Sequence, residues 1–254
     1  MYPMQPPDSC QMPSWWPHLT LPPYKEGKYG NWEIKINNPP MIRSFYRGLI
    51  KPDHDNYILK KNGKLWMSTT PMEIESQGVY IHAAHGNVVI GGLGMGLTLY
   101  NMAIKPNVTS ITVYEEDADV INLFEKCSGF DKWACKDKVY LLCDDILDSI
   151  PEERPEQPVD LLYMDIWSEL GDEYAQANTI DAYNIFNPKI TGWWGMEVDF
   201  IDYCTDRGVD YSTVTEGTLM GWQEELGMRI VPMDHAKEWI HMANVAAVNI
   251  MNML

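Results

Sequence analysis

The sequence predicts an α/β protein in which a small N-terminal β-hairpin domain precedes a doubly wound, mostly parallel sheet. Four short apolar runs typical of strands alternate with segments of helical periodicity between residues 87 and 186. A glycine-rich turn, residues 91–96, follows the first run. Strands joined by helices form right-handed crossovers, so this alternation favours parallel strands with helices on both faces. Asn62-Gly63 lies between two further strand-like runs and predicts a tight hairpin.

The four expected strands and their helices can be placed along the chain. The strands are expected at 88–90, 111–114, 138–143 and 159–164, and the helices between and after them at 97–104, 118–126 and 173–186. Beyond Pro188 the pattern favours helices at 193–203 and 236–254 and a strand at 209–215.

The chain divides into three regions. Residues 1–23 hold seven prolines and two tryptophans, which predicts an irregular arm because proline propagates neither helix nor central strand. Residues 24–85 carry the hairpin signals of the small β domain. Residues 86–254 form the expected Rossmann-like domain, which has a helical C-terminal part.

The composition of the chain indicates which classes of binding partner and which cellular location to expect. The 254 residues carry a net charge of −17, which argues against a nucleic-acid partner because phosphate backbones bind through Lys and Arg. An acidic surface instead favours a small, cationic substrate. The sequence has neither an apolar run of ~20 residues nor a basic, apolar leader, so we expect no membrane partner and a cytoplasmic location.

Cysteine and histidine spacing predicts no metal and no disulfide framework. The five cysteines contain no C-x-x-C pair, so reduced thiols are the better interpretation.

A second copy of the chain remains open as a partner, since the tryptophans of the arm are suited to packing on the body of the protein or on a neighbouring subunit.

Glycines and acids follow the expected strands in order. Ligands of open α/β sheets lie at the carboxyl ends of the strands, where Gly92, Gly94 and Gly96 allow close backbone approach and the helix near residue 97 offers N–H groups to an anion. Glu115 ends the second strand and is placed to accept from ribose hydroxyls. Asp144 and Asp145 end the third and are placed to accept from an adenine amine.

The glycine spacing favours one nucleoside cofactor over others. A dinucleotide fingerprint requires Gly or Ala at the sixth position counted from Gly92, and that position is Leu97. A P-loop is absent as well, because no Gly-Lys-Ser/Thr follows. S-adenosylmethionine fits better, since it has one ribose, one adenine and a sulfonium cation that an acidic cleft tolerates.

These motifs resemble the class I methyltransferase superfamily, and within it the spermidine-synthase-like branch. The resemblance covers about residues 57–170 and is carried by the loop at 90–96, the Glu-x-Asp-x-x-Val-Ile pattern at 115–121 and Cys143-Asp144-Asp145. It implies S-adenosylmethionine as cofactor, or decarboxylated S-adenosylmethionine if the chain is an aminopropyltransferase. The hairpin region up to Glu73 is similar to the small β domain of that branch, and this places Glu73 at the substrate.

The segment after the fourth strand is expected to carry the reaction. Asp165 and Glu169 are the titratable groups nearest the transferred carbon and are the candidate catalytic residues; Asp165 is also a candidate cofactor ligand. Trp167 offers a π face to a cationic or planar substrate. Aminopropyltransferases have an Asp-Ser-Ser-Asp-like run here, whereas this chain has Ser168 where the last aspartate would stand.

Three functions remain open from the sequence. The first is an S-adenosylmethionine-dependent methyltransferase that acts on a small molecule. The second is a polyamine aminopropyltransferase, which the acidic charge favours and Ser168 disfavours. The third is a noncatalytic protein that keeps the fold and binds S-adenosylmethionine or a protein partner.

Overall fold

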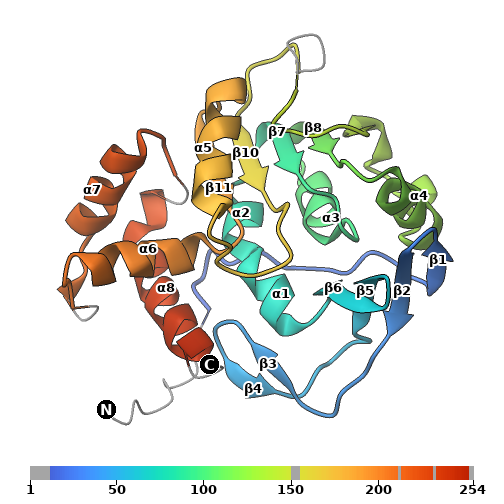
Figure 1. Ribbon diagram of the computed structural model, residues 1–254, viewed down its shortest axis with the longest axis horizontal. Coiled ribbons are helices and arrows are strands. Elements are labelled where there is room, and N and C mark those ends of the chain that lie inside the picture. Colours follow the sequence, from blue (N-terminus) through green and yellow to red (C-terminus); the bar gives the residue numbers. More distant parts are fainter. Residues whose placement is uncertain (1–11, 150–154, 211–212, 231–232, 252–254) are drawn as a thin grey trace.

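A five-stranded parallel sheet forms the centre of the protein (Figure 1). The computed structural model describes residues 12–149, 155–210, 213–230 and 233–251. Its strands are β7 (Gly86–Gly91), β8 (Val108–Tyr114), β9 (Val139–Leu142), β10 (Leu161–Met164) and β11 (Ile190–Trp193), and they lie in the order β11-β10-β7-β8-β9. All neighbouring pairs are parallel. The predicted α/β fold is therefore confirmed.

Helices join these strands and flank the sheet. They are α3 (Leu97–Ala103), α4 (Ala118–Cys127) and α5 (Ala175–Phe186), within two residues of the predicted bounds. All four residues of β10 are buried, as expected for a central strand that is covered on both faces. Apolar runs without alternation were thus a correct sign of a parallel sheet.

The order of the strands creates a switch point at β7. This strand pairs with β8 on one side and with β10 on the other, so the connections that leave β7 and β10 diverge. A crevice forms at the carboxyl ends of strands at such a point.

A second, antiparallel sheet precedes the parallel one. It contains β1 (Gly27–Tyr29), β2 (Trp32–Ile36), β5 (Tyr57–Lys61) and β6 (Lys64–Ser68) in the order β1-β2-β5-β6. Asn62 and Gly63 have φ values of 53° and 79°, which confirms the predicted tight turn between β5 and β6. Helix α4 packs against β1 and β2, so the antiparallel sheet stands beside the crevice.

Two short helices within 24–85 were missed by the sequence analysis. They are α1 (Pro71–Ser76) and α2 (Gly78–Ala83). Thr70 is the N-cap of α1, and its side chain accepts a hydrogen bond from the backbone N–H of Glu73; Pro71 suits the first helical turn. Each helix is too short to show a clear apolar period. The N-cap at Thr70 and Pro71 was therefore the available sequence signal for α1.

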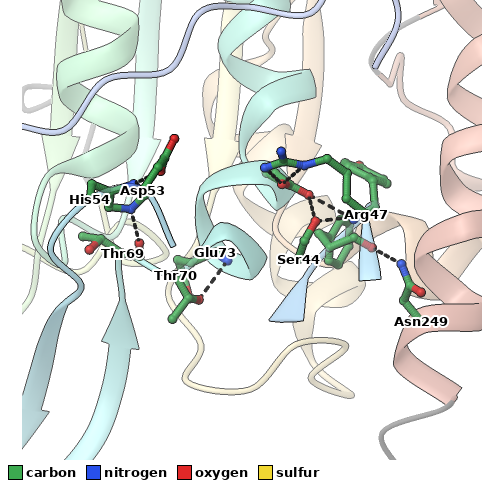
Figure 2. A network of polar contacts seen from close by, with 11 residues as sticks. Ser44, Arg47, Asp53, His54, Thr69, Thr70, Glu73 and Asn249 are labelled. Atoms are coloured by element: carbon green, nitrogen blue, oxygen red, sulfur yellow. Dashed lines mark hydrogen bonds and ion pairs between the residues drawn. The ribbon is translucent and has the colours of Figure 1, made fainter. Parts of the chain in front are cut away.

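A two-stranded ribbon is hydrogen-bonded to α1 and to the C-terminal helix α8 (Ala236–Met251; Figure 2). The ribbon consists of β3 (Ile42–Ser44) and β4 (Gly48–Ile50). Glu75 of α1 is buried and accepts hydrogen bonds from the Arg47 guanidinium and from the Ser44 hydroxyl. Asn249 donates its side-chain amide to the carbonyl oxygen of Phe45 at 2.8 Å. These contacts fix α1, which contributes to the crevice.

The C-terminal part differs most from the prediction. Residues 190–193 form β11, which was missed, and the helix expected at 193–203 is α6 (Met196–Asp206). Gly195 has a φ of 90° at its N-cap, so the chain leaves the strand through a left-handed residue that a helix beginning at 193 would not allow. The strand expected at 209–215 is wrong for the described residues, since 209, 210 and 213–215 pair with no strand; residues 211–212 lie outside them.

The described part of this C-terminal region contains the α-helices α6, α7 (Glu216–Leu226) and α8. Helix α7 was missed, and α8 (Ala236–Met251) confirms the predicted final helix up to residue 251; residues 252–254 lie outside the described chain. Phe200 of α6 packs against Trp222 of α7 and Trp239 of α8, with ring centroids 5.3 and 5.2 Å apart. This aromatic core explains why the region folds as helices despite its weak periodicity.

Within the described residues, no helix is both long and apolar enough to cross a membrane. Over the same ranges, no group of three or more His, Cys, Asp or Glu side chains is arranged to hold a metal ion. Residues 12–23 of the arm pack on the body, where Trp16 lies edge-on to Tyr46 at 5.6 Å; residues 1–11 lie outside the description.

Candidate functional site

A cavity of about 290 Å³ lies at the carboxyl ends of β7, β8 and β10. Its walls include most of the residues that the sequence singles out: Glu73, Gly92, Gly94, Glu115, Asp144, Asp145, Asp165 and Trp167. They come from α1, from the loops after four strands and from both halves of the sheet. The switch point therefore brings together residues that are up to 94 positions apart, counted from Glu73 to Trp167.

Glu115 links the glycine loop to the next turn. Its Oε2 accepts from the backbone N–H of Leu93 at 3.1 Å and its Oε1 from that of Asp117 at 3.0 Å. Each carboxylate oxygen has a second lone pair that remains for a ligand donor. Burial raises the pKa of Glu115, while the two backbone hydrogen bonds act in the opposite direction.

The three glycines of the loop serve close packing. A Cβ on Gly92 would lie 2.0 Å from the carbonyl oxygen of Asp165, and one on Gly94 would lie 2.4 Å from the Met67 sulfur. A Cβ on Gly96 would lie 2.2 Å from the Phe124 ring. Gly92 and Gly94 border the cavity. Gly96, which was predicted to bind cofactor, is absent from the cavity lining and instead allows α3 to approach α4.

Several backbone donors of the loop are engaged within the protein. The N–H of Met95 donates to the Met67 sulfur at 3.2 Å, and the N–H of Gly96 donates to the carbonyl of Leu93 at 2.8 Å. With Leu93 donating to Glu115, fewer N–H groups face an anion than the sequence suggested. The loop therefore shapes the cavity more than it supplies donors.

The aspartates after β9 provide acceptors. Asp145 Oδ1 accepts from the backbone N–H of Leu147 at 2.9 Å. Asp144 Oδ2 is buried and finds no hydrogen-bond partner among the described residues. A buried carboxylate oxygen in this state is costly unless a ligand donor reaches it, so Asp144 fits a ligand that presents an amine or a hydroxyl.

Two acids face the cavity from opposite elements. Asp165 follows β10, and its Oδ2 accepts from the side-chain amide of Gln77 at 3.2 Å. Burial raises the pKa of Asp165 to about 7, with Gln77 acting in the opposite direction. Burial, followed by the charge of Asp165, raises the pKa of Glu73 well above its ordinary value. The pair therefore holds a proton readily near neutral pH, or a cation in its place.

Aromatic side chains that the sequence analysis did not assign to the site complete the walls. Trp32 and Trp66 lie beneath the ammonium group of Lys61, 4.7 and 5.3 Å from their ring centroids. Trp194 lines the cavity and donates to the Ser76 hydroxyl at 2.9 Å. Trp167, which the sequence did place at the site, lines the cavity as well, and its indole N–H is buried without a hydrogen-bond partner within the described chain. Trp66 and Met67 lie in β6, the strand that follows the Asn-Gly turn, and this turn was the available signal for their position.

Glu169, the second candidate catalytic residue, lies apart from this group. It is exposed, as is Ser168, and neither lines the cavity. The chain after Asp165 turns so that Ile166 and Trp167 face the cavity instead. Of the two acids, only Asp165 is placed to contact a ligand here.

Comparison with known proteins yields structural neighbours alone. No protein-family model matches the chain, and no curated protein sequence matches it. It is similar to the crystal structure of spermidine synthase from Thermotoga maritima, with 15% identity over 63% of this chain and 52% of that chain and a TM-score of 0.39.

Methyltransferases are among the other neighbours. An rRNA methylase from Streptococcus thermophilus matches at 11% identity over 44% of this chain and 61% of that chain, with a TM-score of 0.33. A spermidine synthase in complex with the transition-state analogue AdoDATO matches at 15% identity over 63% of this chain and 51% of its own, with a TM-score of 0.38. The chain thus spans about half the length of the spermidine synthases that it matches.

Proposed function

We propose that this protein is an S-adenosylmethionine-dependent transferase, and most specifically a methyltransferase that acts on a small molecule. The observation that carries the proposal is the row of carboxylates from Glu115, Asp144, Asp145 and Asp165 along one cavity at the switch point. Carboxylates there accept from the donors of a nucleoside and tolerate a sulfonium cation. Asp144 Oδ2, which has no hydrogen-bond partner among the described residues, also favours a ligand that supplies a donor there.

The residues divide between binding and chemistry. Glu115 would hold the ribose hydroxyls, and Asp144 and Asp145 the adenine amine. The cofactor supplies an electrophilic carbon bonded to a sulfonium. The protein's part is to align the acceptor with that carbon and to remove a proton where the acceptor is an amine or a hydroxyl. Asp165, with its pKa raised to about 7, is suited to accept that proton.

A second candidate function is aminopropyl transfer from decarboxylated S-adenosylmethionine. That cofactor lacks the carboxylate of S-adenosylmethionine, which suits a loop whose N–H donors from Leu93 and Met95 are engaged with Glu115 and Met67. Glu73 and Asp165 would then hold a cationic amine. A third candidate is a noncatalytic protein that binds S-adenosylmethionine without turnover or interacts with a protein partner.

Products distinguish the three functions. The protein is incubated with S-adenosylmethionine or its decarboxylated form and a panel of polyamines and small amine, hydroxyl and thiol acceptors. S-adenosylhomocysteine indicates methyl transfer and methylthioadenosine indicates aminopropyl transfer. Binding with neither product supports the noncatalytic binding protein. Absence of binding of either form contradicts both transferases and leaves only a noncatalytic interaction protein.

Removing the Glu115 carboxylate is expected to weaken binding of S-adenosylmethionine. Glu115→Ala removes a charged acceptor, which typically costs ~1–3 kcal/mol, or about 5- to 150-fold in Kd. Isothermal titration calorimetry measures the change. Glu169→Ala removes the same charge from an exposed position outside the cavity and serves as the control. Equal affinities of the two variants would contradict the proposed ribose contact.

A further inference from the structure

A chain of side-chain contacts leads from the sheet interior to Asp165. The Tyr163 hydroxyl, from β10, donates to the Oε1 atom of Gln77. Gln77 joins α1 to α2, and its Nε2 donates to Asp165 Oδ2 at 3.2 Å. Tyr163 is 0% exposed and Gln77 1%, so water does not compete for these contacts.

Tyr163 determines which end of the Gln77 amide faces the aspartate. Burial raises the pKa of Tyr163 well above its ordinary value, so the phenol keeps its proton and acts as a donor. An amide accepts through its oxygen and donates through its nitrogen. With its oxygen held by Tyr163, Gln77 presents its NH2 group to Asp165.

We propose that Tyr163 is a positioning residue, which acts through Gln77 to hold one oxygen of Asp165 as an acceptor and leave the other for the ligand. The role of Asp165 as proton acceptor rests on the proposed function. The orientation of Asp165 by Tyr163 and Gln77 does not, because every contact in the chain is made by the protein itself.

Loss of the phenol would change the protonation of Asp165. Without Tyr163, the buried oxygen of Gln77 would have lost its donor, and a protonated Asp165 could supply one after the amide turns. Besides Tyr163, Glu73 from α1 and Tyr80 from α2 are described residues whose pKa the charge of Asp165 raises. Both are left in place by a change of Tyr163 to phenylalanine.

The test is the pKa of Asp165, followed through its carboxyl carbon by NMR in the full-length protein without cofactor. Tyr163→Phe and Gln77→Leu are each expected to raise this pKa by about one pH unit. Because Tyr163 acts through Gln77, adding Tyr163→Phe to Gln77→Leu should raise it no further. Assignment of the signal comes from its loss in Asp165→Asn.

Tyr80→Phe is the matched control. The Tyr80 ring packs on Tyr163 with centroids 4.6 Å apart, but its hydroxyl donates to Glu197 at 3.3 Å, so its removal should leave the Asp165 pKa unchanged. An unchanged or lowered pKa in either single variant, or effects that add in the double variant, would overturn the proposal. If Tyr163→Phe does not fold, the pKa of Asp165 in Gln77→Leu decides whether the proposal holds. Calorimetry with S-adenosylmethionine, done separately, reports on the proposed function alone.

Discussion

Gly92→Ala is expected to lower the free energy of unfolding by about 3–5 kcal/mol, since it combines backbone strain with overpacking. The alanine Cβ would lie 2.0 Å from the carbonyl oxygen of Asp165. That oxygen belongs to the backbone just after β10, so it cannot swing aside as a side chain would. Gly92 also has a φ of 90°, where a Cβ is strained.

Gly63→Ala separates the two contributions. Gly63 has a similar φ of 79°, but a Cβ there meets nothing within 4 Å. We therefore expect it to cost only about 1–2 kcal/mol, the strain alone. Urea denaturation of both variants measures the difference. Equal losses would mean that β7 and β10 do not approach as closely as described.

The second large effect concerns pH. Glu197 at the start of α6 is 1% exposed and accepts from the Tyr46 and Tyr80 hydroxyls at 3.2 and 3.3 Å. Burial raises the pKa of Glu197 to about 7, against the hydrogen bonds that favour the charged form. The folded protein therefore holds this proton across a pH range in which the unfolded chain has lost it.

Proton linkage gives the direction in which stability changes with pH. Between about pH 4.5 and pH 7 Glu197 holds its proton in the folded state and has lost it in the unfolded state, so the contribution of Glu197 to stability falls as pH rises through this window. Glu197 alone contributes roughly 3 kcal/mol to the fall. Burial raises the pKa of Asp165 to about 7 and that of Asp199 to about 6, so both act in the same direction.

Glu197→Gln removes the contribution of that one proton. Between about pH 5.5 and about pH 8 the variant should lose roughly 2 kcal/mol less stability than the unmodified protein, because about 1.5 pH units of this window lie below the pKa of Glu197. Urea denaturation at the two pH values measures it. Glu238→Gln, on the exposed face of α8, should show no such difference. A variant with the same pH dependence as the unmodified protein would show that Glu197 is already ionised at the lower pH.

The parallel sheet was predictable because its signals are local. Strands β7 and β10 contain unbroken apolar runs, and β8 contains a run at 111–114 that only Thr112 interrupts. Each run is followed by a glycine or an acid, and apolar runs of this kind are buried in the folded protein. Strand β11 was not predictable in the same way, because Ile190–Trp193 is short and its last residue, Trp193, together with Trp194 after it also suits a helix. Its pairing with β10 is a long-range contact that no local pattern encodes.

Half of the site was predictable for a similar reason. Acids at strand ends converge once the sheet is parallel, so Glu115, Asp144 and Asp165 could be expected in one cavity. Trp66 and Met67 reach the same cavity from β6, and Gln77, between α1 and α2, reaches Asp165 through a hydrogen bond. These positions depend on packing between distant segments, which no local pattern predicts. Glu169 was predicted at the site because it is close to Asp165 in sequence, but it is exposed and does not line the cavity.

The cavity has walls from both sheets, since Trp66 and Met67 come from the antiparallel one and the carboxylates from the parallel one. Trp32 donates to Asp117 at 2.8 Å across the same boundary. Any molecule held there acts as a bridge between the two halves of the protein. When such a molecule is bound, backbone amides in β6 should exchange with deuterium more slowly. Strand β6 belongs to the antiparallel sheet, whereas the carboxylates Glu115, Asp144, Asp145 and Asp165 all follow strands of the parallel sheet.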